Sequence, residues 1–255
     1  MKGLEGKTAI VTGAGSGIGR AVARRLGAEG CIVGVLDRNA NAADDTVRSL
    51  RAEGASAHAY AVDITDLAAV RTAVQAFETD AGPIDVLVNN AGWDKAAPFL
   101  ASTPELWKQL IDINLYGPIN MHYAVLPGMV ARRRGRVVNI ASDAGRVGSS
   151  GESVYSACKG GIIAFTKTLA REHARHNIVL NAVCPGPTDT PLLRSFADEG
   201  EAGAKLIESL TRAIPMRRLG QPDDYPGIVA FLASDDAAFI TGQTISVSGG
   251  LTMNG

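Results

Sequence analysis

Short apolar runs alternate along this chain with longer segments that have helical periodicity. The apolar runs lack polar alternation, which is typical of strands buried on both faces of a parallel sheet. They predict seven strands, at Thr8–Val11, Cys31–Leu36, Ala57–Val62, Val86–Val88, Arg136–Ile140, Val179–Val183 and Thr244–Val247. The segments between them predict helices at Ile18–Glu29, Asn41–Glu53, Leu67–Asp80, Pro104–Val130, Ser153–Ala174 and Asp223–Ala233. Strand and helix in repeated alternation predict an α/β fold, a doubly wound parallel sheet with helices on both faces.

The chain has 255 residues, and no Pro- or Ser-rich linker divides it. Folds of this class reach about 200–250 residues around one core, so we expect a single domain over residues 1–255. One segment breaks the alternation. Residues 185–222 contain no predicted strand and only short amphipathic patches such as Lys205–Ile214. We expect a lid insertion over about residues 187–221, before the last strand, with a surface decoration as the alternative.

Composition excludes several classes of protein. Apolar residues make up 46% of the chain, and 25 Lys and Arg against 26 Asp and Glu give a net charge of −1. Basic residues are scattered apart from 132–136, so we expect neither a nucleic-acid nor a membrane partner. Three cysteines without a CxxC pair and four dispersed histidines predict no disulfide framework and no metal. Without a secretory signal or an apolar span of about 18 residues, the expected location is the cytoplasm.

A glycine-rich loop, TGAGSGIG at residues 12–19, follows the first predicted strand and opens the first predicted helix. Glycines there permit a tight turn, close backbone approach to a pyrophosphate and close packing of the helix. The helix N-terminus adds free N–H groups and a positive dipole end. An ordinary tight turn is the alternative for the loop alone. The residues predicted to bind a dinucleotide here are Gly13, Ser16, Gly17, Ile18 and Gly19.

Polar residues at the ends of the next strands extend this prediction. Asp37 lies 18 residues after Gly19, where a carboxylate accepts the ribose hydroxyls of NAD and repels the 2′-phosphate of NADP. NAD is therefore favoured over NADP, although the adjacent Arg38 could pair with a phosphate. Asp37 could instead cap the next helix, for which Asn39 or Asn41 is the better candidate. Further cofactor contacts are predicted at two more strand ends, at Asp63, Ile64, Asn90, Ala91 and Gly92.

Tyr155 and Lys159 are four residues apart in a predicted helix, so their side chains project from one face. A neighbouring ammonium would lower the pKa of a phenol from its ordinary value of about 10, as a general base for an alcohol requires. Ser142 follows the strand RVVNIA and could hydrogen-bond a substrate oxygen. Asn114 could hold a water near Lys159. Each residue taken alone is more often structural, but the set in this order predicts catalysis.

The motifs TGAGSGIG, NNAG, Ser142, Tyr155-x-x-x-Lys159 and Pro185-Gly186 together resemble the short-chain dehydrogenase/reductase family over essentially the whole chain. The resemblance implies a Rossmann-type fold, a homotetramer and reversible hydride transfer between a secondary alcohol and NAD. It also implies that Ser142 positions the substrate oxygen and that Tyr155 is the acid/base. Lys159 would lower the pKa of Tyr155 and hold the nicotinamide ribose, and Asn114 would complete a proton relay. The remaining cofactor contacts implied are Pro185, Gly186, Thr188 and Thr190.

Loops after the strands should line the substrate pocket. The residues predicted there are Trp93, Asp94, Ser142, Asp143, Ser149 and Glu152. Stretches such as NNAGWD and SDAGRVGSSGESVYSACKGG further resemble family members that oxidise cyclic 2-hydroxyacyl-CoA thioesters of the 2-hydroxycyclohexanecarboxyl-CoA type, so that substrate class is expected. One alternative is a small substrate without CoA, a free cyclic or aryl alcohol or ketone. Others are a 3-oxoacyl-acyl-carrier-protein reductase and, remotely, a non-catalytic NAD sensor.

Overall fold

The computed structural model describes residues 1–197 and 201–253. A sheet of seven strands forms its centre, in the order β3-β2-β1-β4-β5-β6-β7, and every neighbouring pair is parallel. The strands are β1 Thr8–Thr12, β2 Ile32–Asp37, β3 Ala57–Ala61, β4 Val86–Asn89, β5 Gly135–Ile140, β6 Ile178–Pro185 and β7 Thr244–Val247. All seven predicted strands are confirmed, and the central ones are buried along their whole length.

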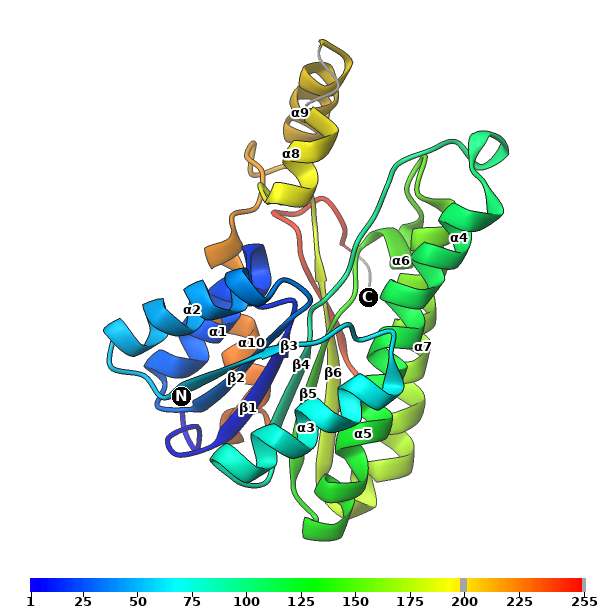
Figure 1. Cartoon of the computed structure of the whole chain (residues 1–255). Helices are drawn as coiled ribbons and strands as arrows, with labels where there is room; N and C mark the ends of the chain where they lie inside the picture. The colour runs from blue at the N-terminus through cyan, green and yellow to red at the C-terminus, as the bar shows by residue number, and fades with distance from the viewer. Residues whose placement is uncertain (198–200, 254–255) are drawn as a thin grey trace.

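Helices cover both faces of the sheet (Figure 1). One apolar core joins the sheet to helices α1, α2 and α10, with Val22 and Val229 among its buried members. The other core joins the opposite face to α3 and α5, through residues such as Phe77 and Met121. The helices named here are α1 Gly17–Ala28, α2 Ala40–Ala52, α3 Leu67–Ala81, α5 Gly117–Arg132, α7 Ser153–His173 and α10 Pro226–Ala233. The structure is thus the expected single-domain Rossmann-like fold.

Two predicted helices differ from the structure at prolines. The expected helix Pro104–Val130 is divided into α4 (Pro104–Ile111), a π-helical segment (Asp112–Tyr116) and α5. The last helix, expected at Asp223–Ala233, is a short 3₁₀ turn followed by α10, which begins at Pro226. Proline lacks the N–H that continues a helix, and a proline lies close to each break. Pro118 follows the π-helical segment, and Pro226 begins α10.

The segment that interrupts the alternation contains helices where only a short amphipathic patch was predicted. Helix α8 (Pro191–Ala197) and helix α9 (Glu201–Ala213) stand above the carboxyl ends of the strands (Figure 1). Their base is closed by a parallel bridge between Thr188 and Gly220. The Asp189 N–H donates to the Gly220 carbonyl at 2.9 Å, and the Gly220 N–H donates to the Pro187 carbonyl at 2.9 Å. The insertion is therefore anchored beside β6, and the Met216 N–H also ties it to the segment after β7 by donating to the Gly249 carbonyl at 3.1 Å.

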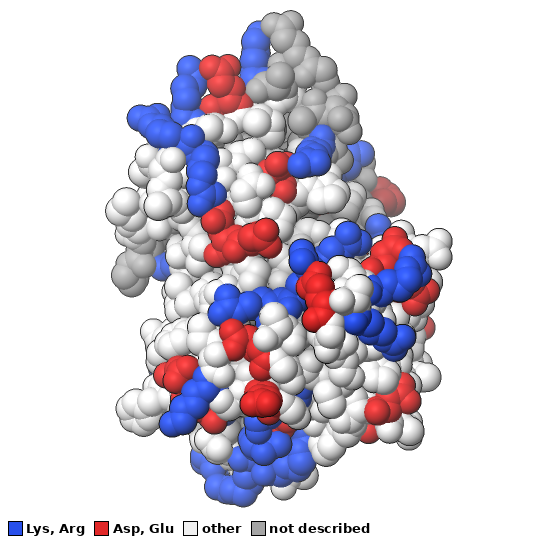
Figure 2. Space-filling model, turned by 90° about the vertical axis from the view of Figure 1, so that its left-hand side faces the viewer, with Lys and Arg blue, Asp and Glu red and all other residues white. Residues whose placement is uncertain are grey.

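Charges of both signs are mixed on one face of the molecule. Figure 2 shows Lys and Arg interspersed with Asp and Glu over the face that carries α1 and α2. Within the described part of the chain, no helix combines the length and apolar character needed to cross a membrane.

Candidate active site

A pocket of about 830 Å³ opens at the carboxyl ends of the central strands. It lies where the strand order reverses between β1 and β4, the position at which open α/β sheets bind ligands. The glycine-rich loop, the ends of β2 and β4, the loop after β5 and the start of α7 all contribute to its wall. Two of the predicted site residues do not line it, Gly19 and Asn114; all the others do.

The glycine-rich loop has the backbone geometry that its sequence predicts. Gly13 and Gly17 adopt positive φ angles of 62° and 52°, which side chains with a Cβ rarely adopt. Gly19 does not face the pocket, because a Cβ there would collide with the Gly13 carbonyl and the Asn90 side chain. Ser16 precedes α1 without capping it through its side chain. The helix N-terminus therefore presents N–H groups toward the pocket, the arrangement that suits a pyrophosphate.

Asp37 ends β2 directly beside this loop. Its Oδ2 accepts a hydrogen bond from the Gly15 N–H at 2.9 Å, and its Oδ1 accepts one from the Asn39 N–H at 2.9 Å. Asn39, not Asp37, caps α2, since its side chain accepts from the Ala42 N–H. Arg38 is exposed at the rim of the pocket. A carboxylate therefore lies beside the phosphate loop, where the adenosine ribose of a dinucleotide would bind.

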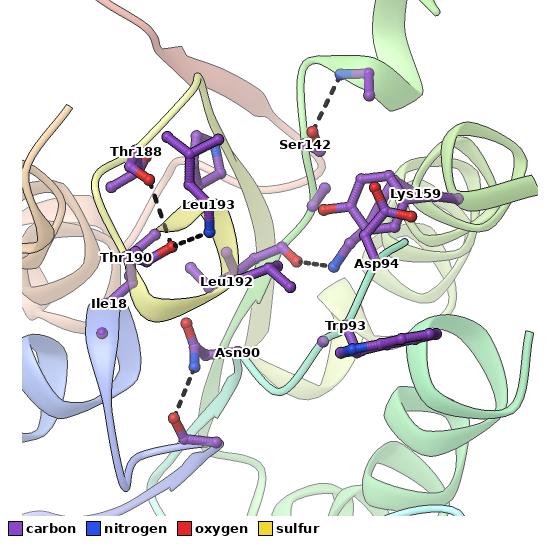
Figure 3. A pocket seen from close by; sticks show the side chains of 18 of the residues that line it. Ile18, Asn90, Trp93, Asp94, Ser142, Lys159, Thr188, Thr190, Leu192 and Leu193 are labelled. Carbon is purple, nitrogen blue, oxygen red and sulfur yellow. Dashed lines mark hydrogen bonds between the residues drawn. The ribbon is translucent and has the colours of Figure 1, made fainter. Parts of the chain in front are cut away.

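Asn90 connects the end of β4 to the loop. Its Nδ2 donates to the carbonyls of Thr12 at 3.0 Å and Gly13 at 3.2 Å. The N–H groups of Asn90 and Ala91 both donate to the Thr12 hydroxyl at 3.0 Å. The side chain of Asn90 is thus occupied in shaping the glycine-rich loop, as Figure 3 shows, although the residue was predicted to contact the cofactor directly.

Ser142, Tyr155 and Lys159 meet on one wall of the pocket. Lys159 is 4% exposed, and its Nζ donates to the Ile140 carbonyl at 3.0 Å and lies 5.5 Å from the centre of the Tyr155 ring. The Ser142 hydroxyl accepts from the Ala144 N–H at 3.1 Å and hydrogen-bonds the Tyr155 hydroxyl. Thr188 and Thr190 face this wall from across the pocket (Figure 3). The three side chains thus bring two hydroxyl groups and one ammonium group together on one wall of the pocket.

The pKa of Tyr155 differs from the sequence-based expectation. Burial raises it above the ordinary value, the carboxyl groups of Asp94 and Glu152 raise it further, and the bond with Ser142 lowers it. Burial also lowers the pKa of Lys159 to about 8. The expected depression of the Tyr155 pKa is therefore wrong for this structure, because burial and two carboxyl groups raise it.

Asn114 lies in the π-helical segment and is fully buried. Its Nδ2 donates to the carbonyls of Trp93 at 2.7 Å and Leu110 at 2.9 Å, and its Oδ1 accepts from the Trp93 N–H at 3.2 Å. The side chain therefore fixes the backbone of Trp93. Because that side chain is occupied, the predicted water near Lys159 would instead donate to the Asn114 backbone carbonyl. Pro118, four residues later, has no N–H to donate to that carbonyl as a regular α-helix would.

Apolar residues of the insertion complete the pocket, and the sequence prediction did not include them. Leu192 and Leu193 of α8 and Leu210 of α9 line it, together with Leu251 from the segment after β7 (Figure 3 labels the first two). The amphipathic pattern of residues 205–214 was the one sequence feature that indicated an apolar contact of the insertion with the pocket. Three arginines of the insertion that the phosphates of CoA could use do not line the pocket, and each pairs with an acid of this chain: Arg194 with Asp189, Arg212 with Glu208, and Arg218 with Asp224.

The sequence model described as enoyl-(acyl carrier protein) reductase matches residues 13–252. The acetoacetyl-CoA reductase of Shinella zoogloeoides is 43% identical over 244 residues, which cover 96% of this chain and 98% of that protein. The 3-oxoacyl-acyl-carrier-protein reductase FabG of Escherichia coli strain K12 is 37% identical over 253 residues, which cover 98% and 99%. The chain belongs to the short-chain dehydrogenase/reductase family.

Solved structures of short-chain dehydrogenases/reductases match the fold closely. A single-residue variant of actinorhodin polyketide ketoreductase with NADPH superposes with a TM-score of 0.92 and 37% identity, covering 98% of this chain and 99% of that one. NAD⁺-bound xylitol dehydrogenase gives a TM-score of 0.92 and 36% identity, with 98% and 100% covered. The chain is thus an oxidoreductase of the ketone and alcohol type that uses a nicotinamide cofactor.

Proposed function

We propose that this chain catalyses the reversible, NAD-dependent interconversion of a β-oxoacyl thioester and the corresponding β-hydroxyacyl thioester. Acetoacetyl-CoA reductase and FabG, named for β-oxoacyl thioester substrates, support the thioester. Neither relative is named for a cyclic substrate, so they favour the 3-oxoacyl reductase alternative over the cyclic hydroxyacyl-CoA. The observation that carries the proposal is the placement of Ser142, Tyr155 and Lys159 in the same pocket as the glycine-rich loop.

The residues present fit a nicotinamide dinucleotide. A Cβ added to Gly17 would lie 3.5 Å from the Thr190 side chain, so glycine keeps a passage open between the loop and the insertion. Bound there, the cofactor would supply or accept the hydride. Residues 13–19 would hold its pyrophosphate, Asp37 its adenosine ribose and Lys159 its nicotinamide ribose.

The chain's own side chains would handle the proton. Ser142 would hold the substrate oxygen by a hydrogen bond, and Tyr155 would transfer a proton to or from the same oxygen. Because the pKa of Tyr155 is raised, the phenol is protonated at neutral pH and ready to act as the acid in carbonyl reduction. In the oxidative direction the phenolate must form, and the Lys159 ammonium, which persists below about pH 8, would stabilise it.

Asp37 supports NAD as the cofactor. The NADPH complex of the ketoreductase variant and the NAD⁺ complex of xylitol dehydrogenase represent both cofactors among similar folds, so the choice depends on residues of this chain. A 2′-phosphate would lie against a carboxylate already fixed by Gly15 and Asn39. We expect Asp37→Ala to shift the ratio of NAD to NADP affinity toward NADP by about tenfold or more. Equal affinities of the unchanged chain for both cofactors would contradict the assignment.

A substrate panel tests the proposed reaction. Initial rates are measured with acetoacetyl-CoA, 2-oxocyclohexane-1-carboxyl-CoA and cyclohexanone, each with NADH and with NADPH. We expect the highest kcat/KM for acetoacetyl-CoA with NADH. A higher value for the cyclic thioester would favour the cyclic hydroxyacyl-CoA reading, which the flat indole of Trp93 on the pocket wall suits. If kcat/KM for cyclohexanone equals the values for both thioesters, a thioester substrate is ruled out.

A further inference from the structure

Asp94 is a buried carboxyl group in the pocket, and the polar groups beside it are the Glu152 carboxyl and the Lys95 N–H. It is 3% exposed and lines the pocket, and neither of its oxygens has a hydrogen bond of ordinary geometry among the described residues. Asp143 on the same pocket differs, because its Oδ1 accepts from the Ser246 hydroxyl. Buried polar atoms nearly always form a hydrogen bond of good geometry, so a carboxyl group without one on a ligand cavity points to a group supplied by the ligand.

The backbone around Asp94 is fixed in this position. The Asn114 side chain binds both the N–H and the carbonyl of Trp93, the residue directly before it. Gly92, two residues before Asp94, is packed so closely that an added Cβ would lie 3.0 Å from Asn114 Oδ1 and 3.3 Å from Lys159 Nζ. The carboxyl group is thus held beside the catalytic wall, as Figure 3 shows with Asp94 and Lys159 together.

Glu152 is the neighbour of Asp94 in the pocket. It directly precedes α7, three residues before Tyr155, and also lines the cavity. Burial and the adjacent Glu152 raise the pKa of Asp94 to about 8. Two carboxyl groups this close do not both ionise, so the pair retains one proton at neutral pH. It therefore offers several acceptor sites and one donor, with a net charge of about one unit.

We infer that Asp94 and Glu152 form a subsite for a second hydroxyl group of the substrate, close to the carbon that is oxidised or reduced. This inference rests on the proposed reacting centre at Ser142 and Tyr155, but it does not require the thioester. The group is a neutral donor and not a cation, because the Lys159 ammonium already balances the single charge of the pair. A hydroxyl both donates to the carboxylate and accepts from the shared proton, so it completes the hydrogen bonding of the pair without adding charge.

Four substrates separate the subsite from the thioester. The thioester pair is 3-hydroxybutanoyl-CoA and 3,4-dihydroxybutanoyl-CoA, and the free pair is cyclohexanol and cyclohexane-1,2-diol. Oxidation rates with NAD give kcat/KM for each. We expect the member with the additional hydroxyl to be preferred by about tenfold or more within each pair. The thioester comparison tests the proposed function, whereas the comparison within pairs tests the subsite, so either can fail alone.

Variants show whether the preference belongs to Asp94. Asp94→Leu removes the acceptors while keeping the volume, and Asp94→Asn keeps an amide that can still bond a hydroxyl. We expect Asp94→Leu to abolish the preference and Asp94→Asn to retain part of it. Glu152→Gln should reduce it, since the shared proton is lost. Lys95→Gln is the matched control, because Lys95 is the exposed next residue of the same loop.

Three outcomes would overturn the subsite. The unchanged chain could oxidise both members of each pair equally well. Asp94→Leu could lower both members by the same factor, as a purely structural role would. Glu152→Gln could also leave the preference within each pair unchanged. The first comparison needs no variant, so a poorly folding Asp94→Leu protein leaves the inference open to refutation.

Discussion

At the scale of single residues, the carboxyl group of Asp94 is expected to destabilise the fold as pH rises. Its folded pKa of about 8 lies above its ordinary value of 3.8. Between those values the folded chain holds a proton that the unfolded chain has lost, so the stabilisation present at low pH declines toward pH 8. Asp94→Asn should therefore increase the free energy of unfolding by roughly 2–4 kcal/mol more at pH 8 than at pH 5.

Urea denaturation at the two pH values measures this difference. Asp45→Asn is a suitable control, since Asp45 lies on the exposed face of α2. Equal effects of Asp94→Asn at both pH values would mean that Asp94 ionises normally and is not buried as described.

The residue scale also shows where sequence reasoning succeeds. The i, i+4 spacing of Tyr155 and Lys159 and the position of Ser142 after a strand were sufficient to predict their meeting. The pKa of Tyr155 was not predictable in the same way. Its direction depends on Asp94, 61 residues earlier in the chain, and on the burial of the assembled pocket. No local sequence pattern predicts that Asp94 lies near Tyr155 or how deeply the pocket buries the phenol.

At the scale of elements, the interruption between α4 and α5 is expected to matter for proton transfer. Pro118 leaves the Asn114 carbonyl without its usual helical partner. Pro118→Ala restores that N–H, and we expect kcat to fall roughly tenfold while cofactor affinity is unchanged. Pro127→Ala, at an exposed position within α5, is the control. An unchanged kcat in Pro118→Ala would exclude the carbonyl from a proton relay.

Glycines in two helices provide a second test at this scale. Gly19→Ala should abolish NAD binding, because its Cβ would displace the Gly13 carbonyl and reshape the loop. Gly227→Ala in α10 meets no atom within 4 Å, so it should stabilise the fold by about 0.5–1 kcal/mol. Calorimetric titration with NAD and thermal unfolding measure the two effects. NAD binding by Gly19→Ala at ordinary affinity would contradict the role of the loop.

Elements were predicted well where a short continuous apolar run marks a strand buried on both faces, as for all seven strands. They were predicted poorly at 104–130 and 187–221. In the first segment the apolar pattern continues through Pro118, so periodicity alone conceals the break. In the second, α8 and α9 depend on packing over the pocket through Leu193 and Leu210, and such tertiary contacts are not written in local spacing.

At the scale of the whole molecule, β7 lies at an open edge of the sheet, and each of its residues is only half-buried. Tyr123 of α5 and Phe239, between α10 and β7, are also exposed. These surfaces support the tetramer implied by the family resemblance, because paired subunits would cover them. Light scattering coupled to gel filtration should give about four times the chain mass of 26.5 kDa. A mass of one chain at micromolar concentration would contradict it.

The central claim is that the pocket performs hydride transfer with Tyr155 as the acid/base, in contrast to a chain that only senses NAD. The most direct measurement compares Tyr155→Phe with the unchanged chain in acetoacetyl-CoA reduction by NADH and in NADH binding. We predict that kcat falls at least about 100-fold, the usual contribution of a positioned acid, while the Kd for NADH changes less than about threefold. Turnover that survives the substitution with NADH still bound would contradict the account.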